Sequence, residues 1–309
     1  MNFTAQDVKA LREKTGVGMM KCKQALVKAD GDMDKAIDIL REEGIAVSAK
    51  KAGRTAADGV VLAYTDEDKN VSVLVEVNSE TDFVAKNEKF TDFVKAVAKT
   101  IADNNPADVD ALLADKLDGK DETVQESLQE LVLSIGENMK IRRFVRQEGV
   151  CSTYIHMGGA VGVLVSFDVA PEIASKDEFK AMGKDVAMQI AAMSPSYLNP
   201  ESVPADVLEH EEGIISAQLK EDPKMANKPE KVLNGIVKGK LNKFYKENCL
   251  LDQEFVKAEK HENVQQYVNS VAKKLGGDIK VTGFTRYAKG EGIEKKKENF
   301  ADEIANMIK

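Results

Sequence analysis

The sequence contains no tryptophan, and aromatic residues make up only 6% of its 309 residues. A surface that stacks nucleic-acid bases needs exposed aromatic rings, so this composition argues against such a platform. Positive charge is also in the minority, since 44 lysines and arginines face 52 aspartates and glutamates and the net charge is −8. Because non-specific binding to DNA or RNA depends on an excess of basic residues, we expect the partners of this chain to be proteins, with no direct contact to nucleic acid.

Cysteine and long apolar runs are scarce as well. The three cysteines are far apart in the chain (Cys22, Cys151 and Cys249), which favours neither a disulfide framework nor a CxxC metal site. No apolar run approaches the roughly 18–20 residues that a membrane-spanning helix needs. The first residues lack the basic and then apolar pattern of a signal peptide. These features predict a protein of the cytoplasm that does not contact a membrane.

Sequence patterns for catalysis are absent too. None of the histidines (His156, His210 and His261) lies three or four residues from another histidine or a cysteine, so no metal site is indicated. The chain contains no GxSxG, HExxH or GxxxxGK[ST] motif. The glycine-rich run 158–162 joins two predicted strands, so a hairpin turn explains it better than a phosphate-binding loop. We therefore predict that the protein is not an enzyme and uses no cofactor or metal.

Residues 1–44 show the pattern of three short helices. Thr4 is a typical N-cap, and apolar residues spaced three and four apart predict one buried face on each of the next two helices. Gly44 is expected to end the third helix. The basic segment 50–54 is then interpreted as a flexible, solvated linker. A module this small has a thin core, so we expect it to be only modestly stable by itself.

Beyond this module the pattern changes to strands and amphipathic helices. A β-hairpin followed by an amphipathic helix is predicted twice, and a helical hairpin follows the second of these helices. The predicted elements are strands 60–64 and 71–77, a polar loop 78–87, helices 90–101 and 124–135, strand 141–148, strands 151–156 and 161–167, helix 179–193, the helical hairpin at about 203–247, helix 264–275, strand 279–287 and helix 300–307.

This order of elements predicts an α+β fold in four parts. The first part is the three-helix module with its linker, and the last is a C-terminal helical module. Between them lie two related β-hairpin-plus-helix subdomains, the second of which carries the inserted helical hairpin. The predicted boundaries are 1–54, 55–149, 150–288 and 289–309.

The polar segment 81–87 connects the first hairpin to its helix, and it is the candidate functional loop because loops on a rigid support often carry function. Phe83 in this loop has two open interpretations: it either staples the loop to the core or projects outward. Met20 and Val27 lie about opposite the predicted buried face of the second helix. This apolar pair is either a docking surface or ordinary surface scatter, and its place on a small module favours docking.

Five segments, in the same order along the chain, resemble the elongation factor Ts family. They are 11–26 (LREKTGVGMMKCKQAL), 76–85 (EVNSETDFVA), 135–143 (IGENMKIRR), 154–156 (YIH) and 290–295 (GEGIEK). The resemblance covers nearly the whole chain, and five collinear motifs are far more specific than any one alone. The sequence departs from the family pattern at Ser79, where the family often has cysteine, and at residues 222–260, which leave the role of the helical hairpin in self-association open.

The resemblance implies a guanine-nucleotide exchange factor in translation elongation. Such a factor binds elongation factor Tu in its GDP-bound and nucleotide-free forms and promotes GDP release. The resemblance also implies that residues 1–54 are a ubiquitin-associated-like module and that the C-terminal helix contacts the partner. The loop that disturbs the partner's magnesium and phosphate site maps onto Thr81, Asp82, Phe83 and Val84. Further partner contacts are implied for Met19, Met20, Lys23, Ile135, Gly136 and His156.

Two other classes of function can be separated from this one by experiment. An adaptor that uses the N-terminal module to bind ubiquitin-like proteins needs no core loop, and a binding assay with elongation factor Tu discriminates it. An enzyme would turn over a metabolite and would have a deep pocket with converging polar groups.

Overall fold

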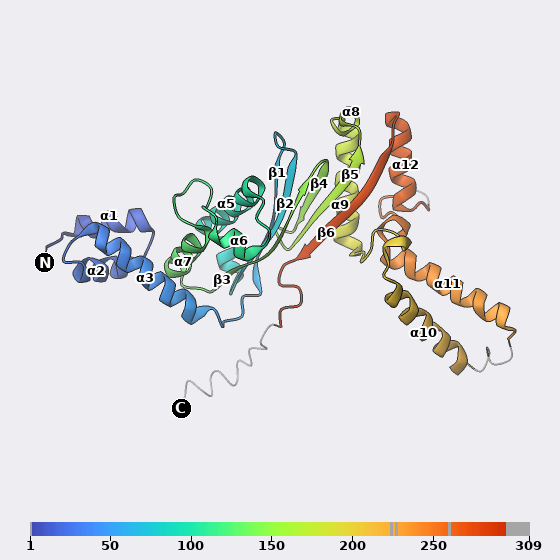
Figure 1. The fold of residues 1–309 in the computed structure, drawn as a ribbon, viewed down its shortest axis with the longest axis horizontal. Coiled ribbons are helices and arrows are strands. Elements are labelled where there is room, and N and C mark those ends of the chain that lie inside the picture. Colours follow the sequence, from blue (N-terminus) through green and yellow to red (C-terminus); the bar gives the residue numbers. More distant parts are fainter. Residues whose placement is uncertain (1, 223–224, 226–227, 259–260, 295–309) are drawn as a thin grey trace. The chain divides into compact units, whose positions relative to one another are not determined.

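The computed structural model describes residues 2–222, 225, 228–258 and 261–294, and in these residues it combines helices with two three-stranded sheets. The strand orders are β1-β2-β3 and β4-β5-β6 (Figure 1). This mixture of helices and sheets confirms the predicted α+β class. The predicted terminal helix at 300–307 lies outside the described residues. Among the described helices, none combines the length and the apolar character that crossing a bilayer requires.

The chain divides into two compact units. One consists of residues 1–146, 155–162 and 287–309, and the other of residues 147–154 and 163–286. The first unit therefore holds the N-terminal helices and the β1-β2-β3 sheet up to Arg146. The second holds most of the other sheet and the helices that follow it. The four predicted domain boundaries stay predictions.

The N-terminal part of the first unit consists of α1 (Ala5–Thr15), α2 (Met19–Lys28) and α3 (Met33–Lys51). As predicted, Thr4 caps α1: its hydroxyl accepts the Asp7 N–H, and the Asp7 carboxylate accepts the Thr4 N–H. One apolar cluster joins the three helices to α7, and its buried members are Val8, Leu11, Val17, Cys22, Ala25, Leu26, Ala29, Ala36, Leu40 and Leu133. The module is thus packed onto the rest of its unit.

Two predictions about α3 were wrong. The helix does not end at Gly44 but continues to Lys51, so Lys50 and Lys51 are helical and do not belong to a flexible linker. Gly44 is buried, and a Cβ at this position would lie 3.4 Å from the carbonyl oxygen of Gln129 in α7. The glycine therefore allows a close approach of two helices, whereas a helix-ending glycine adopts the left-handed conformation.

The larger core of the first unit lies between its sheet and α5. The predicted hairpin is confirmed, because β1 (Asp58–Asp66) and β2 (Val71–Ser79) pair antiparallel along their whole length. The elements that follow are α4 (Asp82–Ala85), α5 (Glu88–Asn104), α6 (Val109–Ala114), α7 (Val124–Ile135) and β3 (Met139–Glu148). The apolar face predicted for α5 is buried throughout: Phe90, Phe93, Val94, Val97, Ala98 and Ile101.

The second set of elements contains the predicted helical insertion. Its elements are β4 (Cys151–His156), β5 (Val161–Val169), α8 (Pro171–Ala174), α9 (Asp177–Met193), α10 (Ala205–Glu221), α11 (Glu230–Asn248), α12 (Val264–Leu275) and β6 (Ile279–Ala288), with short 3₁₀ turns at Pro200–Ser202 and Leu250–Asp252. α10 and α11 lie side by side and share a small apolar cluster around Ile215, Leu219 and Leu241 (Figure 1). Met193 belongs to the apolar pattern of the predicted helix 179–193, but it is exposed at the last position of α9.

The elements from β1 to β3 form a first set, and those from β4 to β6 form the second set. Five elements of the second set match the first in order and in length, although β4 is shorter than β1 and the α10–α11 hairpin is added. β2 and β5 each have nine residues, and α5 and α9 each have 17. A buried phenylalanine occupies the third position of both long helices, at Phe90 and Phe179, and both helices end in a left-handed residue, Asn105 and Ser194. α7 and α12 each have 12 residues, begin with a capping box and end at a left-handed glycine. Positions in the two sets can therefore be compared one by one.

Candidate functional site

The candidate loop contains a one-turn helix whose neighbouring residues face opposite ways. In α4, Val84 is buried in the core of the first unit, whereas the side chain of Phe83 is 80% exposed. Successive helical residues are separated by about 100°, so burying Val84 turns Phe83 outward. The interpretation of Phe83 as a staple to the core is therefore wrong. Val84 makes the contact with the core that the staple interpretation assigned to Phe83.

A carboxylate from another loop holds the start of this helix. The side chain of Glu137, just after α7, accepts two hydrogen bonds from Thr81: the backbone N–H at 3.0 Å and the hydroxyl at 2.7 Å. In the opposite direction, the backbone N–H of Asn138 donates to the carboxylate of Glu80 at 2.5 Å. The Ser79 hydroxyl donates to the Thr81 carbonyl oxygen at 2.9 Å. The loops 79–84 and 136–138 are thus joined by reciprocal hydrogen bonds.

The end of α3 reaches the same place. The Lys51 amine donates to the carbonyl oxygen of Gly136, and the Asn138 side-chain amide donates to the Arg54 carbonyl oxygen at 2.8 Å. Gly136 ends α7 in the left-handed conformation with φ 88°, which any residue with a Cβ adopts only with strain. The segment 136–138 is therefore held from the α3 side and from the candidate loop.

The last turns of α7 also support the exposed face of α2. Met19 and Met20 are exposed, Met20 by 67%, and together with Leu133 and Ser134 they line a shallow groove. The carbonyl oxygen of Gly16 accepts the Ser134 hydroxyl at 2.7 Å and the Lys89 amine at 2.9 Å. Lys23 lies exposed on α2 as well. The structure thus places the α2 candidates and the loop candidates on one support, the carboxyl end of α7.

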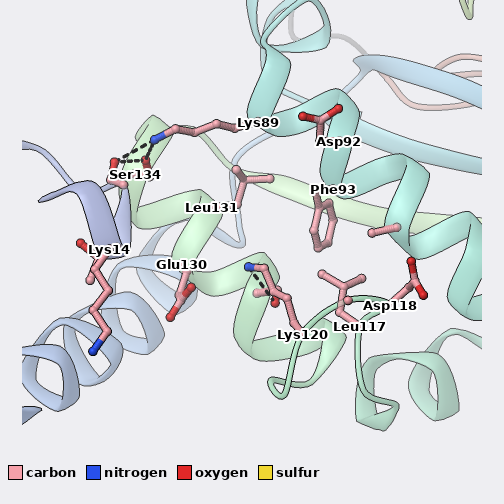
Figure 2. A pocket seen from close by; sticks show the side chains of 15 residues that line it. Lys14, Lys89, Asp92, Phe93, Leu117, Asp118, Lys120, Glu130, Leu131 and Ser134 are labelled. Carbon is pink, nitrogen blue, oxygen red and sulfur yellow. Dashed lines mark hydrogen bonds between the residues drawn. The ribbon is translucent and has the colours of Figure 1, made fainter. Parts of the chain in front are cut away.

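A hollow of about 500 Å³ lies between α1, α5 and α7, and it does not have the features of an active site (Figure 2). Three of its charged groups are bonded to protein: Lys89 to Ser134, Asp118 to Lys99 at 2.9 Å, and Lys120 to Ser127. In the described part of the chain, no group of three or more histidine, cysteine, aspartate or glutamate side chains could hold a metal ion. We interpret the hollow as a seam between packed helices, because Lys89 and Lys120 are bonded to serines of its own wall.

Ile135 and His156 are the remaining candidates. Ile135 is partly buried against the core that contains Val84. His156 is exposed at the end of β4, where its carbonyl oxygen accepts the Gly159 and Ala160 N–H groups of the tight turn before β5. This turn confirms that the glycine-rich run is a hairpin turn.

Another carboxylate, which sequence analysis missed, holds the segment after β6. Glu76 in β2 is fully buried, and it accepts hydrogen bonds from Arg142 at 3.0 Å, Arg143 at 2.7 Å and the Gly290 N–H at 2.8 Å. Burial raises the pKa of Glu76, but the N–H donors of Gly290, Asn78 and the two arginines outweigh it and leave the pKa below its usual value. The segment that leads to the C-terminal residues is thereby tied to the first sheet.

The sequence alone does not predict the contacts of Glu76 or Glu137. A single acidic residue inside an apolar strand, as at Glu76, is a detectable anomaly, but its partners lie far along the chain. Glu137 follows a helix-ending glycine, where acidic residues are common on surfaces. Only the folded chain shows that it contacts Thr81.

Comparison with known proteins identifies relatives along the whole chain. The family model described as Elongation factor TS matches residues 80–291. A protein named Elongation factor Ts from Clostridium perfringens is 47% identical over 308 residues, which cover 99% of both chains. Proteins of the same name from Trichlorobacter lovleyi and Nautilia profundicola are 47% and 46% identical over 311 residues, covering 99% of this chain and 98% and 99% of theirs. The chain therefore belongs to the elongation factor Ts family, whose members act in translation elongation.

Proposed function

We propose that this chain is a guanine-nucleotide exchange factor for elongation factor Tu. It binds the GDP-bound partner, disturbs the partner's magnesium and phosphate site, and releases GDP. The observation that carries the proposal is the outward position of Phe83, which is 80% exposed at the tip of a one-turn helix. A large exposed ring on a rigid support is typical of a contact residue.

The physical basis of exchange is a coupling free energy between two ligands of the partner. A factor that binds the nucleotide-free partner more tightly than the GDP-bound partner lowers the affinity for GDP by the same ratio. GDP and magnesium are held by backbone amides and by oxygen ligands around a hard cation. A protein that displaces part of this site needs no chemical step, so the factor makes and breaks no bond and uses no cofactor.

Phe83 and Asp82 suit the two requirements of such a displacement. The ring of Phe83 is a rigid apolar body that gains free energy on burial and cannot share space with packed side chains. Asp82 is exposed beside it and forms an ion pair with Lys86 at 3.0 Å. Its carboxylate only accepts hydrogen bonds, so it perturbs a site that is organised around phosphate and a cation. Thr81 and Val84 hold these two residues in place.

The other candidate residues act as partner contacts that add affinity. We assign Met19, Met20 and Lys23 to an N-terminal docking face, and Ile135, Gly136 and His156 to contacts around the loop. The α2 residues sit on the ubiquitin-associated-like module of residues 1–54, and the C-terminal residues 289–309 add a further contact. The helical hairpin at about 203–247 is an appendage of the second subdomain, and self-association through it is part of the proposal.

Release of labelled GDP tests the proposal directly. Elongation factor Tu loaded with fluorescent GDP is mixed with excess unlabelled GDP, with and without this chain, and the release rate is recorded as the chain concentration rises. The proposal expects a rate that rises and then saturates. A chain that binds the partner and leaves the release rate unchanged would instead be an adaptor, which is the second candidate because Met20 is exposed on the N-terminal module.

A further inference from the structure

The two sets of elements contain equivalent loops that differ in one respect. α8 follows β5 as α4 follows β2, and both helices have four residues. The third residue of each is buried, Val84 in α4 and Ile173 in α8. The second residue of each is exposed, but it is Phe83 in the first loop and Glu172 in the second. The inward contact is therefore common to both loops, and the outward aromatic ring is specific to the first.

The two sets also differ in the residue that follows the glycine at the end of α7 and of α12. Gly136 is followed by Glu137, whereas Gly276 is followed by Gly277. A Cβ at Gly277 would overlap with Cδ1 of Ile173, so the second loop fills this place with an apolar side chain. In the first loop the Glu137 carboxylate reaches Thr81 at 2.7 and 3.0 Å. The polar clamp thus occurs in the loop that carries the exposed ring.

A one-turn helix needs such support. Isolated helices shorter than about 12 residues are marginal in water, and α4 has four residues. Its N-cap residue, Thr81, makes no side-chain capping bond to the helix, and its hydroxyl donates to Glu137. The start of the helix is therefore held by a tertiary contact and not by a local cap. Thr81 directly precedes Asp82 and Phe83, so this contact fixes the start of the helix from which both side chains project, while the burial of Val84 turns Phe83 outward.

We propose that Glu137 is a positioning residue for the exchange loop. It holds Thr81 by two hydrogen bonds, so that Phe83 is presented in one orientation before the partner binds. Preorganisation of this kind removes the entropy loss that ordering the loop would require when it displaces the nucleotide site of the bound partner. The inference rests on the proposed exchange function for its effect on GDP release. The clamp itself can be tested in the free protein.

The first experiment measures the clamp without any partner. Amide hydrogen exchange of residues 80–84 is compared in wild type, Glu137→Ala and the control Glu67→Ala, which removes one exposed carboxylate from the β1–β2 turn. A hydrogen bond to a charged acceptor protects its donor, so exchange of the Thr81 amide should be about tenfold faster in Glu137→Ala. Unchanged exchange at Thr81 in Glu137→Ala would overturn the clamp.

The second experiment measures the consequence for GDP release from elongation factor Tu. Glu137→Ala should lower the maximal release rate about tenfold, with little change in the concentration that gives half the maximum, whereas Glu67→Ala should match wild type. Glu137→Gln keeps one acceptor oxygen and should fall between wild type and Glu137→Ala. If Glu137→Ala only destabilised the fold, its melting temperature would fall, and its GDP release rate would equal that of wild type at temperatures below unfolding.

A double variant tests whether Glu137 acts through Phe83. If Phe83→Ala and the double variant Phe83→Ala/Glu137→Ala release GDP equally slowly, the two residues act as one unit, as proposed. If the double variant is slower by the product of the two single-variant factors, the two residues act independently and the positioning role is overturned. Failure of wild type to accelerate GDP release would reject the proposed function but leave the amide-exchange result intact. Accelerated release by wild type and equally fast release by Glu137→Ala would reject the inference alone.

Discussion

The first and second sets of elements share a scaffold and differ in where they add polar residues. At the sixth position of the nine-residue strand, β2 has Glu76 and β5 has Ser166. Glu76 binds two arginines and the Gly290 N–H. Ser166 makes only neutral hydrogen bonds: it donates to the Gly283 carbonyl oxygen at 3.2 Å and accepts from the Thr282 hydroxyl at 2.9 Å. Apolar positions and helix caps therefore define the shared scaffold. In the first set, the buried carboxylate of Glu76 and the partly exposed carboxylate of Glu137 attach a distant segment and the candidate loop to it.

The largest effect is expected at Glu76. Glu76→Gln removes the charge that faces Arg142 and Arg143, and breaking a buried ion pair from one side costs about 3–5 kcal/mol of folding free energy. Ser166→Ala, at the equivalent position, should cost only about 1–2 kcal/mol, because it removes two neutral hydrogen bonds. Urea unfolding of both variants measures the difference. Equal losses would show that the buried carboxylate is not what distinguishes the two sheets.

The stability difference between wild type and Glu76→Gln is also expected to depend on pH. The pKa of Glu76 is lower in the folded chain than in the unfolded chain, so its contribution is complete above the unfolded-state pKa and is lost as the pH falls through the folded-state value. The stability difference between wild type and Glu76→Gln should therefore shrink in acid. A difference that stays constant from neutral pH into the acid range would contradict this.

The next effect concerns activity rather than stability. Phe83→Ala should slow the maximal GDP release by about 30- to 150-fold, which corresponds to about 2–3 kcal/mol of lost differential binding. The melting temperature of the free protein should barely change, because the ring is 80% exposed. The matched variant Glu172→Ala in the second loop should alter neither quantity. Similar slowing by both variants would remove the functional distinction between the loops.

A smaller effect is expected where α9 meets β4. The seventh residue of α5 is Val94, whereas the seventh residue of α9 is Gly183. A Cβ at Gly183 would lie 2.9 Å from Cβ of Ser152, too close for ordinary contact, so Gly183→Ala should cost about 1–3 kcal/mol through overpacking. Thermal unfolding measures this loss. A melting temperature at or above that of wild type would show that the helix and strand separate at little cost.

The smallest effect is expected in the inserted hairpin, and it has the opposite sign. Gly239 lies inside α11, and a Cβ at this position would have no neighbouring atom within 4 Å, so Gly239→Ala should stabilise the helix by about 0.5–1 kcal/mol. Slower amide hydrogen exchange in α11 would confirm it. Unchanged or faster exchange would contradict this prediction.

Local patterns in the sequence predicted most of the elements. The capping box of Thr4 and Asp7, the spacing of Phe90, Val94 and Val97, and the stop at Gly136 depend on residues within one or two turns. Such interactions act over a few residues, so a local sequence contains them in full. Gly44 was misread because its role depends on Gln129, which lies on another helix.

The candidate loop was predicted in place, but its geometry was not. From sequence, Phe83 had two interpretations, and the burial of its neighbour Val84 excludes one of them. The functional roles of residues 81–84 stay predictions, together with those of Met20 and His156.

By itself, the sequence determined the positions of helices and strands, the apolar faces that form the cores, and membership of a protein family. These properties follow from short-range hydrogen bonds, from residue spacing and from similarity along the chain. Only the tertiary structure decided which polar residues are buried and what they hold. Glu76 meets Arg143, and Glu137 meets Thr81, across long separations in the chain. A carboxylate is stable in such a place only when donors from other segments surround it, and their arrival is a property of the folded chain.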